Sequence, residues 1–162
     1  MILDIKTYPN KVLTKKTKPV GEIDADTKKL IDDMAETLYV KRGAGLAANQ
    51  VGVSKQIIVV DESRGEGKVK ILINPKIVRK KGAAIMVEGC LSLPGLELEI
   101  KRPEKIEVEY LDKNSRQREL KAEQLLARII CHEVDHLDGK TMLDRLPLLK
   151  RLKMKRQLRK SF

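Results

Sequence analysis

The stretch Cys131-His132-Glu133-Val134-Asp135-His136 decides how the rest of the chain has to fold. It contains both histidines of the 162 residues, and they stand four positions apart. Apolar residues recur at helical spacing over residues 123–139 around it. Residues i and i+4 of a helix lie on one face, so His132 and His136 can bind one metal ion. We therefore predict a metal-binding helix, with Glu133 beside the ion to handle the proton of a bound water.

An H-E-x-x-H pattern also arises in amphipathic helices that bind no metal, so the prediction requires a third ligand. Cys131 adjoins His132 and points about 100° away from it on a helix, as a packing residue would. Cys90, the other cysteine, lies in Val87-Glu-Gly-Cys-Leu-Ser-Leu-Pro-Gly95. The glycines and proline of this loop let the backbone approach an ion or a substrate. We predict Cys90 as the third ligand, with water in the fourth position.

Three blocks of the sequence resemble motifs of the peptide deformylases. Glu88-Gly-Cys-Leu-Ser-Leu-Pro94 is similar to their E-G-C-L-S motif, and residues 132–136 match their H-E-x-D-H. Gly43-Ala-Gly-Leu-Ala-Ala-Asn-Gln-Val-Gly52 is similar to G-x-G-L-A-A-x-Q. The blocks stand in the family's order, and the similarity extends over nearly the whole chain. Asn49 is a departure, because the family commonly has proline there, and we expect it to loosen the loop.

The resemblance implies an amide hydrolase that removes the formyl group from the initiator methionine of new bacterial or organellar polypeptides, with release of formate. It implies Fe(II) on Cys90, His132 and His136. Thiolate ligation excludes Mg and Ca, but by itself leaves Zn, Ni or Co as alternatives to iron. We expect a metal-bound hydroxide to attack, with Glu133 as general base and then as general acid.

The resemblance also assigns groups that hold the substrate. Backbone groups between Gly43 and Gly45 would bind the substrate main chain. The side-chain amide of Gln50 would stabilise the oxyanion, because an amide donates hydrogen bonds without titrating. The backbone N–H of Leu91, directly after the predicted cysteine ligand, would be a second donor.

Two further pairs of residues belong to the predicted site. Leu125 and Ile129 precede His132 by seven and three residues on the metal-facing side of the helix. They could line an apolar pocket for a methionine side chain, or they could simply be core. We predict that Glu88 forms an ion pair with Arg102 next to the metal ligands. The alternative is that Glu88 lies in a loop with its carboxylate in solvent.

The rest of the chain predicts an α+β fold of short, mostly antiparallel strands wrapped around the central metal-binding helix. A first helix is expected from Asp24 or Asp26 to Arg42-Gly43, because Asp caps helices and an apolar stripe follows it. Strand patterns fall at residues 56–61, 70–75, 76–79, 96–100, 105–111 and 116–121, with Pro75 separating the second from the third.

The length of 162 residues favours one catalytic domain over residues 1–162. Residues 140–143 are expected to be short and extended. Pro147 opens a last helix that we expect to be anchored through apolar residues near its start, namely Leu148, Leu152 and Leu149.

The net charge of +11 is concentrated at the C-terminal end. Residues 145–162 carry eight Lys or Arg and no Asp or Glu. One interpretation is docking to ribosomal RNA by neutralising phosphates, and the other is a solvated, fraying helix end. No apolar run is long enough for a membrane span and no signal peptide is recognised, so we expect a cytoplasmic protein.

Two other functions compete with the deformylase interpretation. A zinc endopeptidase would share the H-E-x-x-H pattern, but it generally uses a carboxylate or histidine as third ligand and needs a long open cleft. A non-enzymatic, basic RNA-binding protein would keep the motif only as a relic. The presence of Cys90 together with His132, Glu133 and His136 argues against both.

Overall fold

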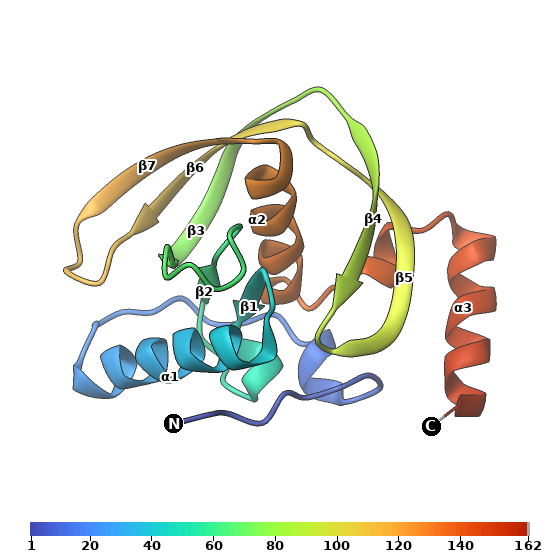
Figure 1. Ribbon diagram of the computed structural model, residues 1–162, viewed down its shortest axis with the longest axis horizontal. Coiled ribbons are helices and arrows are strands. Elements are labelled where there is room, and N and C mark those ends of the chain that lie inside the picture. The colour runs from blue at the N-terminus through green and yellow to red at the C-terminus, as the bar shows by residue number, and fades with distance from the viewer. Residues whose placement is uncertain (162) are drawn as a thin grey trace.

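The computed structural model describes residues 1–161 and contains, over these residues, three α-helices and seven strands (Figure 1). The helices are α1 (Ala25–Lys41), α2 (Gln124–Leu137) and α3 (Leu148–Ser161). The strands are β1 (Gly45–Ala47), β2 (Ile57–Val60), β3 (Lys70–Lys81), β4 (Ala84–Cys90), β5 (Leu93–Arg102), β6 (Lys105–Leu111) and β7 (Gln117–Glu123). Short 3-10 helices are η1 (Lys11–Thr14), η2 (Ala48–Val51) and η3 (Met142–Arg145). None of the helices in the described range has the length and apolar character to span a membrane.

The strands form two antiparallel sheets. One has five strands in the order β1-β2-β3-β6-β7, and the other is the β4-β5 pair. Figure 1 shows α2 in the middle, between the arching β3, β6 and β7 strands and the β4-β5 pair. Helix α2 contacts β1, β2 and β7. The predicted α+β fold with antiparallel strands around a central helix is therefore confirmed.

Helix α1 begins where the sequence predicted. The side chain of Asp24 accepts a hydrogen bond from the Thr27 N–H at 2.8 Å, which is N-cap geometry. The helix buries Ile31, Met34 and Leu38 in a cluster shared with β2. It ends at Lys41, and the left-handed backbone of the capping residue Arg42 closes the last turn.

Helix α2 is buried on its polar face as well as on its apolar one. Ile130 is fully enclosed in the largest core cluster. His132, Glu133 and Asp135 are each less than a tenth exposed. Burying a polar group costs free energy unless it has a hydrogen-bond or metal partner. The polar side chains of this face must therefore have such partners inside the protein.

The predicted break at Pro75 is wrong. Strand β3 runs through it with a shift in register between Ile73 and Lys76. Asn74 adopts a φ of 51°, and its side chain bonds to both the N–H and the C=O of Val20. A bulge leaves one residue outside the ladder, and so it tolerates a proline that has no N–H to donate.

The expectation of an extended segment at residues 140–143 is also wrong, since η3 begins at Met142. Thr141 caps this 3-10 helix: its side chain accepts a hydrogen bond from Leu143 N, and the carboxylate of Asp144 accepts one from the Thr141 N–H. The prediction missed this capping pattern, because it spans only four residues and two of them are apolar.

Helix α3 packs through a different face from the predicted one. The three leucines expected to anchor it are 59%, 82% and 54% exposed: Leu148, Leu149 and Leu152. Met154 and Leu158 instead pack against the cluster formed by β5 and η3. Arg151 and Lys155 both reach Asp144. Since the ion pairs and the apolar contacts fall on the same side, they decide which side of the helix faces the protein.

Candidate metal centre

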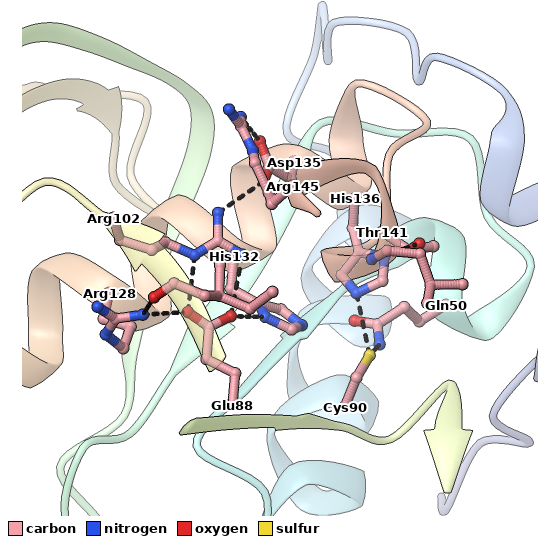
Figure 2. Close-up of polar contacts among 12 residues, drawn as sticks. Gln50, Glu88, Cys90, Arg102, Arg128, His132, Asp135, His136, Thr141 and Arg145 are labelled. Carbon is pink, nitrogen blue, oxygen red and sulfur yellow. Dashed lines mark hydrogen bonds and ion pairs between the residues drawn. The ribbon is translucent and has the colours of Figure 1, made fainter. Parts of the chain in front are cut away.

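Cys90, His132 and His136 come together from the end of β4 and the C-terminal half of α2. Their potential ligand atoms all lie within 4.8 Å of one another. Cys90 Sγ lies 3.2 Å from His136 Nε2, and Figure 2 marks this contact with a dashed line. A thiolate and two imidazoles so placed suit a divalent transition metal and not Mg²⁺ or Ca²⁺. The residues present therefore fit a divalent transition-metal ion, as the ligand set predicted from the sequence requires.

The carboxylate of Glu88 is hydrogen-bonded to ring nitrogen Nδ1 of His132. Its Oε1 lies 2.9 Å from His132 Nδ1 and accepts a hydrogen bond from Arg102 Nη2 at 3.0 Å. Its Oε2 accepts hydrogen bonds from Arg102 Nε at 2.8 Å and from Arg128 Nη1 at 2.5 Å. Because Nδ1 is occupied, the other ring nitrogen of His132 is left for a ligand. The predicted pair of Glu88 and Arg102 lies in this buried cluster.

The protonation of these groups follows from their surroundings. Burial alone would raise the pKa of Glu88, but hydrogen bonds from His132 and Arg102 hold it at about 2. Burial alone would lower the pKa of His132, yet its hydrogen bonds with Cys90 and Glu88 raise it to about 10 in the protein chain by itself. Metal ligation needs a neutral imidazole, so binding an ion releases this proton.

Two buried charged residues of α2 were missed by sequence reasoning. Arg128 donates to Glu88 and also to the main-chain oxygens of Ile100 and Ala84. Asp135 accepts hydrogen bonds from Arg102 at 2.7 Å and from Arg145 at 2.8 Å.

A signal for Arg128 existed in the sequence. It stands in an apolar run, four residues before His132 and thus on the same helix face. A cation in such a place requires a buried partner. The sequence alone does not say which carboxylate that partner is.

Glu133 lies against β1 with its carboxylate enclosed. Its side-chain atom Oε2 is buried and has no hydrogen-bond partner within residues 1–161. Burial raises its pKa to about 7, against the opposing effects of His132 and Arg102. A carboxylate with such a pKa, beside the potential ligands, is suited to take up and release a proton near neutral pH.

Gly45 leaves room for that carboxylate. A Cβ atom at this position would lie only 2.5 Å from Glu133 Oε1 and 2.8 Å from Glu133 Cγ. Gly43 is similarly tight, since its Cβ would come within 2.8 Å of Leu38 and 3.0 Å of Leu91. Close packing thus requires glycine at position 45, whereas a side chain at position 43 would have to displace the ends of two leucine side chains.

Gly45→Ala is expected to lower kcat about 10- to 100-fold, because a shift of about 1 Å in a reacting group can cost that much. Metal content should stay at the wild-type value, because Gly45 contacts none of the potential ligands. Gly21→Ala is the matched control, since nothing lies within 4 Å of its added Cβ. Equal turnover in the two variants would contradict the requirement for room beside Glu133.

Gln50 lies in η2, and both the oxygen and the nitrogen of its side-chain amide make hydrogen bonds. Its Oε1 accepts a hydrogen bond from the Ala47 N–H at 2.8 Å. Its Nε2 donates to Ser92 Oγ at 3.1 Å and lies 3.7 Å from Cys90 Sγ (Figure 2). The amide therefore presents its NH2 group, and not its oxygen, to the thiol side of the site.

Asn49 does not loosen this loop, contrary to expectation. Its side chain is buried, and its Nδ2 donates to the main-chain oxygen of His136 at 2.5 Å. The hydrogen bond ties η2 to the last turn of α2. A proline at this position could not make it.

The remaining predicted residues line one cleft of about 460 Å³ that opens beside the potential ligands. The predicted substrate residues in its wall are Gly43, Gly45, Gln50, Leu91, Leu125 and Ile129. Leu125 is 38% exposed at the opening, whereas Ile129 is 6% exposed and also belongs to the main core cluster. A hollow of similar size, about 430 Å³, lies along strands β3, β6 and β7 and contains none of the predicted site residues.

Comparison with known proteins agrees with this geometry. The model of the polypeptide deformylase family matches residues 2–152. The peptide deformylase of Thermodesulfovibrio yellowstonii is 49% identical over 152 residues, which are 93% of this chain and 92% of that protein. The crystal structure of a peptide deformylase from Legionella pneumophila has a TM-score of 0.92 at 40% identity and covers 99% of this chain and 95% of its own. That of Ehrlichia chaffeensis, in complex with actinonin, has a TM-score of 0.90 at 40% identity and covers 99% of this chain and 97% of its own.

Proposed function

Because this chain belongs to the peptide deformylase family, we propose how the residues of its cleft share the hydrolysis of an N-formyl group. The chain is a metal-dependent hydrolase that removes the formyl group from nascent polypeptides. The observation that carries this conclusion is the meeting of Cys90, His132 and His136 next to the enclosed carboxylate of Glu133.

Cys90, His132 and His136 would hold one divalent metal ion. When bound, the ion supplies a Lewis acid that polarises the formyl oxygen and lowers the pKa of water. We propose Fe(II), with Zn, Ni or Co as substitutes, because the thiolate favours these metals over harder cations. The hydrogen bond between Glu88 and His132 Nδ1 supports the assignment, since it fixes the ring for ligation.

Glu133 acts as the proton carrier. It takes a proton from the attacking water as the new C–O bond forms at the formyl carbon, and it delivers that proton to the methionine nitrogen as the C–N bond breaks. The products are formate and a free α-amine. The Nε2 group of Gln50 and the backbone N–H of Leu91 donate to the oxygen on which negative charge develops.

The substrate lies in the cleft between β1 and the β4-β5 pair. Backbone groups from Gly43 to Gly45 bind its main chain, and β1 is the edge strand of its sheet, as such binding requires. Leu125 and Ile129 bind the methionine side chain. Their position in the cleft wall supports this role.

The decisive test is formate release from a formyl-Met dipeptide, with protein purified without oxygen and reconstituted with Fe(II). Wild-type protein should release formate, and Cys90→Ala should lose both the metal and the release. An unformylated peptide of the same sequence should remain intact. Cleavage of that peptide, without formate release, would favour the endopeptidase alternative instead.

We further propose that α3 docks on ribosomal RNA and that the protein works in the cytoplasm. Arg145, Arg151 and Lys155 pair with acidic residues of the chain itself. The other cations of residues 145–161 make no ion pair within the described range and remain for phosphates: Lys150, Lys153, Arg156, Arg159 and Lys160. A thiolate ligand such as Cys90 also survives best in a reducing compartment.

Replacing Lys150, Lys153 and Arg156 together by Ala should weaken sedimentation with ribosomes at least about tenfold at moderate salt. Formate release from a dipeptide should not change, because these side chains do not line the cleft. The triple variant keeps Met154 and Leu158, which anchor the helix. Undiminished binding to ribosomes would contradict docking through this helix.

A further inference from the structure

Two arginines stand at the opening of the cleft on the side of α1 and β1. Arg42 and Arg64 both line it, together with Cys90 and Glu133, and both are exposed. The arginines that form ion pairs within residues 1–161 are others: Arg79, Arg102, Arg118, Arg128, Arg145 and Arg151. Arg42 and Arg64 therefore line the cleft without an ion pair to any carboxylate of residues 1–161.

The backbone beneath each arginine is held in an uncommon conformation. Arg42 has a φ of 52° and Arg64 a φ of 53°, a region that glycine or asparagine enters at lower cost. The N–H of Arg42 donates to the oxygen of Tyr39 at 3.1 Å, and that of Arg64 to the oxygen of Asp61 at 3.1 Å. The fold thus fixes the backbone positions from which both side chains extend at the opening.

The loop that carries Arg64 is built around a buried carboxylate. Asp61 is 4% exposed, and its side chain accepts hydrogen bonds from the backbone N–H groups of Ser63 and Gly65, each at 3.0 Å. The loop lies against α1, since a Cβ at Gly65 would be 3.6 Å from the ring of Tyr39. The two arginines consequently belong to one wall of the cleft.

The wall formed by β5 carries the opposite charge. Glu97 lines the cleft there, beside Pro94 and Gly95, and makes no ion pair within residues 1–161. The third arginine in the cleft, Arg128, is neutralised by Glu88. The opening is thus positive toward α1 and negative toward β5. An extended peptide between the walls turns successive side chains to opposite sides.

We propose that Arg42 and Arg64 select for an acidic side chain within the first residues after the formylated methionine. This specificity rests on the proposed function, because the substrate must lie in the cleft for its next residues to pass the two arginines. Each pair is exposed and screened by solvent, so the preference for Glu over Lys is about three- to tenfold in kcat/KM at low salt. It shrinks as salt rises.

A series of formylated peptides tests the proposal. Formyl-Met peptides carry Glu, Gln or Lys at one of the three positions after methionine, and kcat/KM is measured at roughly 20 mM and 500 mM salt. The wild type should prefer Glu to Lys at one position or more. Arg42→Glu with Arg64→Glu should invert that ratio, and Glu97→Lys should increase it.

Two further variants keep the result interpretable. Arg42→Asn with Arg64→Asn removes both charges with a residue that tolerates this backbone, and it should bring the ratio close to one. Arg42→Lys with Arg64→Lys should retain the preference. Arg116→Glu with Arg159→Glu, at two exposed arginines that do not line the cleft, changes the net charge by the same amount and is the matched control for charge alone.

The outcomes separate this inference from the proposed function. No formate from the neutral Gln peptides in the wild type would overturn the function itself. Formate release with equal rates for Glu and Lys peptides, or with a ratio that the Arg42 and Arg64 variants leave unchanged, would overturn only the charge selection. An inverted ratio in Arg116→Glu with Arg159→Glu as well would show a long-range effect of net charge, and would also overturn the charge selection.

Discussion

Glu133→Gln is expected to lower kcat for formate release by about 10²- to 10⁴-fold, the range that loss of a positioned proton carrier produces. The amide has nearly the same shape as the carboxylate but cannot take a proton from water. Since Glu133 is not one of the three potential ligands, the variant should still bind one metal ion per chain. Metal analysis and the formate assay on the same preparation measure both quantities.

The stability of this variant adds a second expectation. The buried carboxylate has a raised pKa because burial disfavours its charge, so a neutral side chain should leave the free energy of unfolding unchanged or slightly higher. Glu99→Gln, on an exposed position of β5, is the matched control and should keep full activity. Retained turnover in Glu133→Gln would refute the proton-carrier role; loss of the metal would make Glu133 a ligand instead.

Periodicity predicted most of the fold, because most elements here have a regular apolar pattern. Helix α1 and helix α2 were predicted nearly to their ends from caps and apolar spacing, and β6 was predicted to the residue. The break at Pro75 was predicted wrongly. Proline cannot donate a hydrogen bond to a neighbouring strand, but a strand can continue through it where a bulge leaves that position unpaired. Asn74, which makes that bulge possible, bonds to Val20, a contact far away in the sequence.

The orientation of α3 shows a limit of the same method. The helix has two sets of apolar residues, one at Leu148, Leu149 and Leu152 and the other at Met154 and Leu158. Spacing alone cannot choose between them. Asp144 decides, because it draws Arg151 and Lys155 to the side on which Met154 and Leu158 lie.

In the site, too, some residues can be predicted from local sequence, whereas others depend on contacts between distant segments. His132 and His136 are placed by one turn of helix, so the motif alone identifies them. The partners of the buried Arg102 and Arg128 come from β4, β5 and α2, and their choice depends on how these segments pack. A charged residue in an apolar run, as at Arg128, signals that a partner exists without identifying it.

Glu88→Gln is expected to lower the free energy of unfolding by about 3 kcal/mol, because it leaves buried cations without their carboxylate. The amide of Gln keeps one acceptor oxygen but carries no charge, and its NH2 group would face donors. Arg128 would then rely mainly on main-chain oxygens, and Arg102 would keep Asp135 as its carboxylate. The ring of His132 would also lose the anion at Nδ1, so metal affinity should fall about 10- to 100-fold. Urea unfolding of metal-free protein and competition with a chelator measure the two effects separately.

A cycle with Arg128→Met distinguishes loss of charge balance from mere loss of contacts. If the penalty in Glu88→Gln comes from an uncompensated cation, removing that cation should restore part of the stability, and the double variant should be more stable than the sum of the single changes predicts. Metal affinity should not recover, because it depends on the anion behind His132 and not on Arg128. Strict additivity in unfolding free energy would contradict the explanation by an uncompensated cation. Recovery of metal affinity in the double variant would show that Glu88 acts on the metal site by another route than orienting His132.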